Sequence, residues 1–437
     1  MDPMTIALIS VGFLFALIIL GVHVGVALAS ISVIGIWAIT GKATVAINLL
    51  QTTAYSAVMD YVFAVIPLFV LMGLFSTLSG ATQELFRTAQ FFLGRIKGGI
   101  GIATVFANAV FAAITGVSVS SAAVFSKIAF PEMERLKYDR KFSLGIIAGS
   151  AILGMLIPPS ILMIVYGVLT ELSIGKLFIA GFVPGLVVTL VLSLGIRLMI
   201  VFKPHLGGVA AEVKKFTFQT MVRETIVSWA ILALIILVLG GIWGGLFTPT
   251  EAGAVGAAGG FLLVVVKGKF NLRNLWQILL DGGQTTASIF MLLICAQMYS
   301  RMLTISGLAS KISQWATTLP VAPFFIILGF VVVFLILGCI IDSTSIILLT
   351  IPIMHPVVVK LGYDPIWFAI VSIITIEIGL ITPPFGMVVF AMKSSLGGKA
   401  SVEDIFQGSL PFLVMLGVSL AIIMAFPILS TWLPSLM

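Results

Sequence analysis

Long stretches without a charged side chain are the feature of this sequence that most limits its fold. Two of them run from Thr5 to Gly41 and from Ile405 to Met437. Further uncharged stretches have the same apolar character: Tyr61–Gln83, Gly98–Ser126, Phe142–Thr170, Thr225–Thr250 and Ile312–Ile341. A helix of about 20 apolar residues crosses the hydrocarbon core of a bilayer, whereas the strands of a transmembrane barrel are shorter and alternate. The sequence therefore predicts an all-α polytopic membrane protein.

Composition and charge exclude several other classes of protein. Only 9% of the 437 residues are charged, too few to cover the surfaces of soluble domains. The net charge of +7 comes from Lys and Arg in short connections between apolar stretches, as the positive-inside rule expects. No basic face with interleaved aromatic residues indicates nucleic-acid binding. Cys295 and Cys339 lie in apolar stretches and predict neither a disulfide nor a transition-metal site. The first apolar stretch lacks a basic n-region and a cleavage site, so we expect a retained span and not a signal peptide.

The second half of the chain resembles the first at an offset of 225 residues. Residues 118–166 align with 343–391 without a gap, and most identities are Pro, Gly, Tyr, Asp or Ser. The identical pairs are Ser118/Ser343, Ser120/Ser345, Ile128/Ile353, Pro131/Pro356, Tyr138/Tyr363, Asp139/Asp364, Gly154/Gly379, Pro158/Pro383 and Pro159/Pro384. The loop after Pro131 is strongly basic, but its counterpart after Pro356 carries Lys360 alone. If basic loops are cytoplasmic, the two copies have opposite orientations. Such inverted-topology repeats are typical of secondary transporters.

This charge pattern gives a consistent threading. Repeat A covers 1–202, a cytoplasmic connecting segment covers 203–224, and repeat B covers 225–437. We expect about ten transmembrane helices, near 5–21, 24–40, 58–78, 142–170, 177–200, 225–245, 252–266, 283–300, 367–392 and 408–432. Segments 98–131 and 321–355 must each begin and end on one side, and arms of about 16 residues reach only ~24 Å. Both are therefore predicted re-entrant hairpins, the first opening to the cytoplasm and the second to the outside. Both termini are then external, and 203–223 and 303–320 are expected to be interfacial connecting helices.

Four breaks fall near the predicted membrane midplane. The hairpin tips, 113–122 and 338–345, carry small and polar residues, and the spans 142–170 and 367–392 are each interrupted by Gly and then Pro-Pro. Because Pro cannot continue the preceding helix, each break presents a helix N-terminus, which suits an anion. Freed carbonyls and hydroxyls suit Na⁺.

We predict one Na⁺ site per repeat and at least two ions. The candidate Na⁺ ligands in repeat A are Gly116, Ser118, Ser120, Ser121, Gly154 and Pro158. Those in repeat B are Gly338, Asp342, Ser343, Ser345, Gly379, Thr382 and Pro383. The candidate substrate-binding residues are Ser120, Ser121, Pro159, Ser160, Thr344, Ser345 and Pro384. No Lys or Arg lies in the four breaks, so helix dipoles, amides and hydroxyls must bind the substrate.

Alternatives remain open at several of these positions. Small residues at the breaks also permit close helix packing. Asp342 can ligate a cation, cap the helix that follows it, or do both. Glu377 lies mid-span without an acidic counterpart at Ile152, and either a coupling role or a buried structural hydrogen bond fits it. An enzyme is disfavoured, because there is no HExxH motif and no arrangement of nucleophile and base. We therefore expect no catalytic residues and no organic cofactor.

Over nearly its whole length the chain resembles the large membrane subunit of the tripartite ATP-independent periplasmic (TRAP) transporters. The motifs that carry the resemblance are Thr115-Gly-Val-Ser-Val-Ser-Ser-Ala-Ala, Phe130-Pro-Glu-Met, Lys137-Tyr-Asp, Ile157-Pro-Pro-Ser, Tyr166-Gly, Gly181-Phe-Val-Pro-Gly, Thr250-Glu-Ala-Gly-Ala and Ile381-Thr-Pro-Pro-Phe-Gly. The chain departs from the family at Val117, where Gly often stands.

The resemblance implies Na⁺-coupled import of a carboxylate-bearing organic solute by an elevator mechanism. It also implies a periplasmic substrate-binding protein, a separate small four-helix membrane subunit, and a place in the lipid bilayer of a bacterial or archaeal inner membrane. A stand-alone two-hairpin Na⁺/carboxylate symporter is the alternative. The particular carboxylate is left open.

Overall fold

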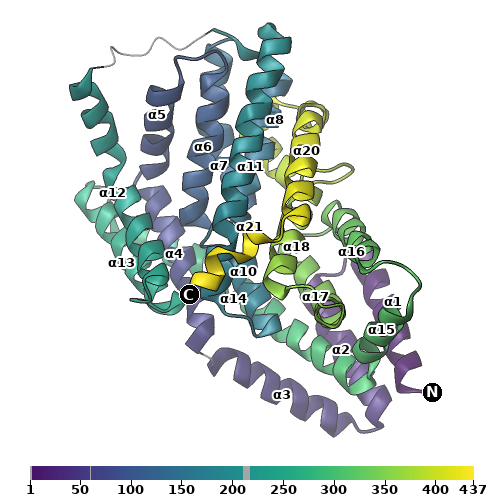
Figure 1. Cartoon of the computed structure of the whole chain (residues 1–437). Coiled ribbons are helices and arrows are strands. Elements are labelled where there is room, and N and C mark those ends of the chain that lie inside the picture. The colour runs from purple at the N-terminus through teal and green to yellow at the C-terminus, as the bar shows by residue number, and fades with distance from the viewer. Residues whose placement is uncertain (1, 60, 210–216) are drawn as a thin grey trace.

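The computed structural model describes residues 2–59, 61–209 and 217–437, and within this part of the chain it contains helices and no strand (Figure 1). The helices of the first half are α1 Pro3–Ile19, α2 Val24–Thr40, α3 Ala43–Met59, α4 Val65–Leu78, α5 Ala81–Leu93, α6 Gly99–Thr115, α7 Ser118–Arg135, α8 Arg140–Ala151, α9 Leu153–Leu156, α10 Ile161–Thr170 and α11 Ile174–Phe202. Those of the second half are α12 Phe218–Trp243, α13 Pro249–Val266, α14 Leu272–Ser306, α15 Leu308–Thr318, α16 Pro323–Gly338, α17 Ser343–Lys360, α18 Pro365–Gly379, α19 Met387–Leu396, α20 Val402–Ala425 and α21 Ile428–Thr431. Short 3-10 turns occur at Tyr61–Ala64, Pro204–Gly207, Gly397–Lys399 and Leu433–Leu436.

Many of these helices are long and apolar enough to cross a membrane. Among the described residues seven segments pass this test, or eight if a bent helix at 219–243 is counted. The seven are Tyr61–Leu78, Arg140–Thr170, Ile174–Phe202, Pro249–Val266, Leu272–Ser306, Ser343–Lys360 and Val402–Ala425. Shorter apolar helices include α1, α2, α6, α16 and α18. The prediction of an all-helical, polytopic membrane protein is confirmed at this level.

Two helices and two connections differ from the expectation. The sequence did not predict α3 or α5, because their polar residues resemble those of loops. The expected helix over 203–223 is wrong in its first part, where Lys203 leaves α11 and only a 3-10 turn follows. Residues 210–216 of that expectation lie outside the described residues, and α12 already begins at Phe218. The expected connecting helix over 303–320 is shorter in the structure, because α14 extends to Ser306 and α15 follows Gly307.

The two predicted hairpins and the two interrupted spans pack against one another, and each hairpin contacts both halves of the chain. The first arm of each hairpin packs on the interrupted span of its own half, α6 on α8 and α9, and α16 on α18. The second arm packs on the other half of the chain, α7 on α19 and α17 on α10. The short helix α9 also contacts α18. The four breaks are thereby gathered in one region.

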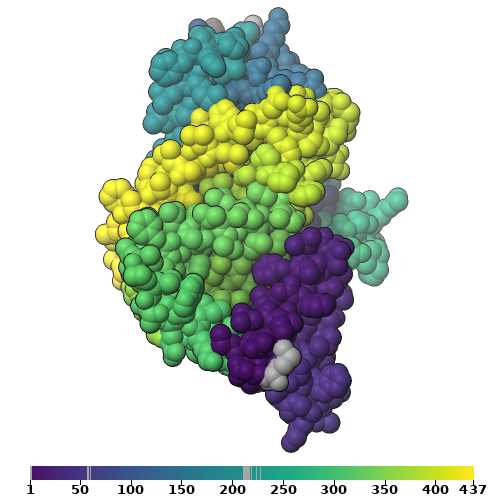
Figure 2. All heavy atoms as spheres, turned by 90° about the vertical axis from the view of Figure 1, so that its right-hand side faces the viewer, coloured from purple at the N-terminus to yellow at the C-terminus, as the bar shows by residue number. Residues whose placement is uncertain are grey.

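The remaining helices surround this centre. The helix α4 packs on α13 and α14, α2 packs on α14, and α12 packs on α13. Helix α3 lies across one end of the molecule and contacts only α2 and α14 extensively (Figure 1). In the space-filling view, the purple N-terminal helices lie against green segments of the second half (Figure 2), in keeping with the contacts of α1 with α14 and α15.

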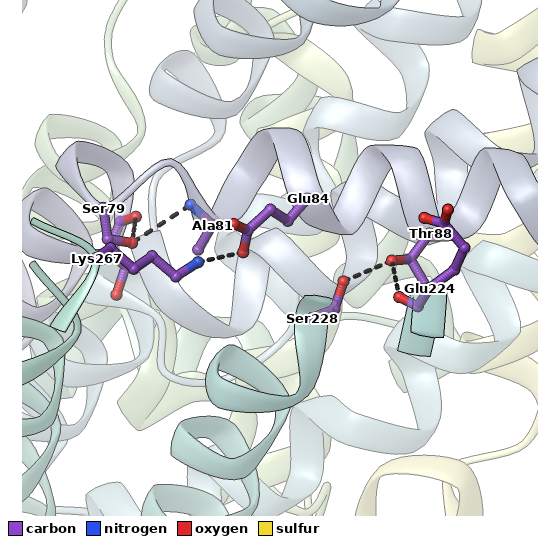
Figure 3. Close-up of polar contacts among 8 residues, drawn as sticks. Ser79, Ala81, Glu84, Thr88, Glu224, Ser228 and Lys267 are labelled. Carbon is purple, nitrogen blue, oxygen red and sulfur yellow. Dashed lines mark hydrogen bonds and ion pairs between the residues drawn. The ribbon is translucent and has the colours of Figure 1, made fainter. Parts of the chain in front are cut away.

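Helix α5 joins the first hairpin to the α12–α13 pair. Its apolar face buries Leu85, Phe86 and Phe91, and it packs against α6. Its polar face contacts the second half of the chain (Figure 3): Thr88 Oγ1 donates to the Glu224 backbone oxygen at 2.9 Å, and Lys267 forms an ion pair with Glu84. The amphipathic sequence of α5 therefore provides an apolar face for α6 and a polar face for the α12–α13 pair.

Candidate functional site

The first hairpin turns at Gly116 and Val117. Gly116 adopts a left-handed conformation with φ 60°, and Val117 is extended. No side chain caps the start of α7, so its first backbone N–H groups are not satisfied by a capping side chain. Such an uncapped N-terminus is a partial positive charge that favours an anion or a polar ligand.

The second hairpin has a different tip. Asp342 is the N-cap of α17, because its Oδ1 accepts from the Ser345 N–H at 3.0 Å. Ser345 Oγ also donates to Asp342 Oδ2, at 2.5 Å. The capping role that the sequence offered for Asp342 is thus present in the structure. A carboxylate that is half-buried and held in this way still has lone pairs for a cation.

The first tip touches the first interrupted span through backbone atoms. A Cβ placed on Gly154 would lie 2.9 Å from both the Cα and the N of Ser118, and one on Gly116 would lie 2.6 Å from the Pro159 oxygen. The Ile161 N–H donates to the Gly116 oxygen at 3.4 Å. Only glycine permits this approach, so the tip and the break form one unit.

The second tip touches the second interrupted span in the same way. A Cβ on Gly379 would lie 2.6 Å from the Gly338 Cα, and one on Gly338 would lie 2.7 Å from the Gly379 Cα. The Gly386 N–H donates to the Cys339 oxygen at 3.4 Å. The Pro-Pro peptide bond of each break is cis.

Glu377 lies between the two tips. The carboxyl group is fully buried, and its Oε1 accepts from Ser343 Oγ at 2.8 Å. Ser118, the counterpart of Ser343 in the 225-residue alignment, also lies near this carboxyl. Apart from each other, the Ser118 hydroxyl and Glu377 Oε2 have no polar partner in the described part of the chain. Glu377 therefore belongs to the region where both halves meet, which its sequence position alone did not show.

Buried polar atoms without partners gather around the first tip. Ser118 and Ser121 are three residues apart on one face of α7, and both hydroxyls are fully buried and unpartnered among the described residues. Buried polar groups are nearly always hydrogen-bonded, so these oxygens keep lone pairs that a ligand could use. All are oxygen donors, the type that hard cations prefer. The residues present fit a Na⁺ ion.

The structure places the other predicted residues less uniformly. Ser120 is exposed on the opposite side of α7 from Ser118 and Ser121, so it does not share their environment. Ser160 is buried and caps α10; it accepts from the Met163 N–H at 3.4 Å and donates to the Met155 oxygen at 2.5 Å. Thr344 and Thr382 are half-buried.

The two breaks differ in exposure. Residues 151–160, which include Pro158 and Pro159, are all buried, whereas Pro383, Pro384 and Phe385 are exposed. The first break is thus closed off by protein, and the second is open on one side.

Sequence reasoning missed one polar contact beside the site. Asn108, on the first hairpin arm, donates from Nδ2 to Ser150 Oγ at 2.7 Å, and both side chains are buried. The only available signal was a lone Asn in an apolar stretch. This contact joins α6 to α8.

Comparison with known proteins places this arrangement in a family. The family model described as "Tripartite ATP-independent periplasmic transporter, DctM component" matches residues 11–429. The chain is 36% identical over 400 residues to the C4-dicarboxylate TRAP transporter large permease protein DctM of Pseudomonas aeruginosa, covering 90% of this chain and 89% of that one. It is 30% identical to the sialic acid TRAP transporter permease protein SiaT of Haemophilus influenzae, covering 85% of this chain and 59% of that one.

A solved structure shares the fold. The Alcanivorax borkumensis YdaH transporter aligns with a TM-score of 0.67 at 14% identity, covering 86% of this chain and 87% of that one. At this identity the likeness concerns the fold alone.

Proposed function

Because the chain belongs to the DctM family, the large membrane components of TRAP transporters, we propose that it imports a carboxylate-bearing organic solute together with Na⁺. The family comprises multi-pass inner-membrane permeases that work with a small membrane subunit and a periplasmic binding protein. The predicted membership of the TRAP transporter family is confirmed. Na⁺ coupling, the site residues and the movement are our proposals.

The observation that carries the proposal is the meeting of two hairpin tips and two helix breaks around buried oxygen atoms. In repeat A, Ser118, Ser121 and the Gly116 carbonyl would hold one ion. In repeat B, Asp342, Ser343 and carbonyls near Gly379 would hold another. Two Na⁺ sites on two tips would order both tips at once, which links ion binding to the shape of the substrate site.

The start of α7 supports carboxylate recognition. No side chain caps it, and helix N-termini bind anions. One relative is named for C4-dicarboxylates and another for sialic acid, and both solutes carry carboxylates. We propose a carboxylate for this chain on both grounds.

The movement that we propose is an elevator. The inverted repeats 1–202 and 225–437 would each supply a hairpin and an interrupted span to a central unit, and the helices around it would form the scaffold. In support, the second arm of each hairpin begins at equivalent positions, Ser118 in one half and Ser343 in the other, 225 residues apart. The crossing of α7 on α19 and of α17 on α10 binds the two halves of the unit together.

Uptake into proteoliposomes tests this proposal. The complete transporter is reconstituted from this chain, its small subunit and its binding protein. Uptake of C4-dicarboxylates, sialic acid and other organic acids is measured with and without an inward Na⁺ gradient, and with the binding protein omitted in parallel. We expect uptake that needs both Na⁺ and the binding protein. Uptake with Na⁺ alone would favour the stand-alone symporter, and uptake without a Na⁺ gradient would refute Na⁺ coupling.

Variants connect uptake to the site. Ser118→Leu and Ser345→Leu place apolar bulk at the two tips and should abolish Na⁺-dependent uptake. Ser288→Leu is a matched control, because Ser288 is exposed on α14 and belongs to neither tip and neither break. All three variants should still elute as folded protein in detergent. Full uptake by the tip variants would refute the site assignment.

A further inference from the structure

A cavity of about 670 Å³ lies outside the four breaks, between α10–α11, the 3-10 turn before α4, and the helices α13 and α14. Its volume is in the range of small-molecule sites. It is lined by the turn at Tyr61–Phe63, the α10–α11 turn at Gly167–Gly175, the start of α13 at Thr248–Thr250, and one face of α14. In the proposed orientation all four segments are at the external ends of their helices. The cavity thus faces the side from which a solute would arrive.

The face of α14 that lines this cavity is polar and carries a cation. Gln297, Ser300 and Arg301 are spaced three and four residues apart, so they share one side of the helix. Arg301 is half-buried, and its Nη1 donates to Thr52 Oγ1 on α3 at 3.4 Å, which is a long contact. Within the described chain it forms no ion pair. Its planar set of five N–H donors therefore remains largely unused, and such a group binds carboxylates in a bidentate manner.

The cavity lining also carries one carboxylate, Glu171, and no ion pair joins it to Arg301 within the described chain. Glu171 is exposed at the end of α10, where it adopts a left-handed conformation with φ 58°. A charge that faces water is screened, whereas one inside a cavity is screened much less. Hydroxyl groups at Ser173, Thr250 and Ser300 add donors to the lining.

We infer that this cavity is an external reception site, in which Arg301 binds the carboxylate of the transported acid before that acid reaches the hairpin tips. The inference rests on the proposed import of carboxylates and on the proposed orientation. It supplies what the four breaks lack, since no Lys or Arg lies in them. Its walls belong partly to α10–α11 and partly to α13 and α14, so an elevator movement would change its shape and release the acid.

Charged thiol reagents test the site without knowledge of the solute. Ser300→Cys is made in a chain with Cys295→Ala and Cys339→Ser, and right-side-out vesicles are treated with an anionic or a cationic methanethiosulfonate. A unit charge about 6 Å from the thiol changes the local concentration of a singly charged reagent by about threefold at the dielectric of water. Arg301→Gln should therefore lower the anionic-to-cationic rate ratio by about tenfold or more. Arg301→Lys should keep most of the ratio.

Lys360→Gln is the matched control, because Lys360 is an exposed cation predicted on the same side and does not line the cavity. It should leave the rate ratio unchanged. An Arg301→Gln ratio equal to that of the unsubstituted background would overturn the inference, as would labelling of Ser300→Cys in inside-out vesicles only.

Uptake then separates this inference from the proposed function. We expect Arg301→Gln to raise the KM of Na⁺-driven uptake more than it lowers kcat, and a transported acid to slow labelling of Ser300→Cys only when Arg301 is present. Unchanged KM and no protection by a transported acid would overturn the reception site while import stands. An Arg301-dependent rate ratio without Na⁺-driven uptake would refute Na⁺ coupling and leave the anion site in place.

Discussion

Replacing Gly379 with alanine tests the contact between the second tip and its break. The added Cβ would lie 2.6 Å from the Gly338 Cα, 3.0 Å from the Gly338 carbonyl carbon and 3.1 Å from the Leu335 oxygen. All three atoms belong to the backbone, so no side chain can rotate away. Ordinary contact begins at 3.4 Å, and the two segments must separate by 3.4 − 2.6 = 0.8 Å.

The energetic cost can be isolated with a control. Overpacking a tight interior costs about 1–3 kcal/mol, while alanine in a helix gains about 0.5–1 kcal/mol over glycine. Gly329, on α16 of the same hairpin, has nothing within 4 Å of an added Cβ, so Gly329→Ala keeps the gain and lacks the clash. The two variants should therefore differ by about 1–3 kcal/mol in stability.

Function should change by more than stability. A displacement approaching 1 Å at a reacting or binding centre can cost about 100-fold. We expect Gly379→Ala to raise the Na⁺ concentration for half-maximal uptake by tenfold or more, and Gly329→Ala to leave it unchanged. Thermal unfolding in detergent and a Na⁺ titration of uptake measure the two effects. Equal melting midpoints and equal Na⁺ titrations for both variants would refute the packing of tip on break.

Three further predictions concern polar groups. Asp342→Asn keeps a capping side chain and removes the charge, so it should preserve the melting midpoint and weaken the Na⁺ dependence of uptake. Asp342→Ala should in addition lower the free energy of unfolding by about 1 kcal/mol. Identical Na⁺ titrations of uptake for Asp342→Asn and the native protein would show that Asp342 acts only as a helix cap. Ser343→Ala removes the hydrogen bond to Glu377 Oε1 and should destabilise the protein by about 1–3 kcal/mol. This loss should be smaller when Glu377→Gln is already present. Equal losses with Glu377 and with Gln at this position would argue against the contact. At the end of α7, past the predicted hairpin, the hydrogen bond from Arg135 lowers the pKa of Glu132, so its stabilisation is present above the ordinary carboxyl pKa and is lost as pH falls through the lowered value. Glu132→Gln should weaken the pH dependence of the melting midpoint between about pH 5 and 3. The same pH dependence in the variant and the native protein would contradict this prediction.

Much of the helical framework could be predicted because uncharged runs and Gly/Pro breaks are local signals. The start of α2 and the ends of α4 and α13 agree with the expected spans. The capping role of Asp342 was one of the two roles that its sequence context allowed. Helix α5 was missed because its charged residues suggest a solvent-exposed loop, and only the fold shows that Glu84 pairs with Lys267.

The candidate site was predictable in its parts and not in its assembly. Alignment at the 225-residue offset identifies Ser118 and Ser343 as counterparts, but no local pattern shows that both lie near Glu377. That proximity results from the packing of each hairpin on the opposite half. The difference in exposure between Pro159 and Pro384 was also unpredictable, because the two motifs are nearly identical in sequence.

The crossing of α7 on α19 has a consequence for biosynthesis. Helix α7 ends at Arg135 and α19 begins at Met387, so about 250 residues are made between them. At about 5–20 residues per second, the ribosome needs roughly 13–50 s for this stretch. During that time α7, with the hydroxyls of Ser118 and Ser121, lies in the bilayer without α19, the helix on which it packs in the finished protein. The nascent first half therefore depends on the insertion machinery or on lipid for protection, and we expect it to be a substrate for membrane quality control if translation stalls before Met387.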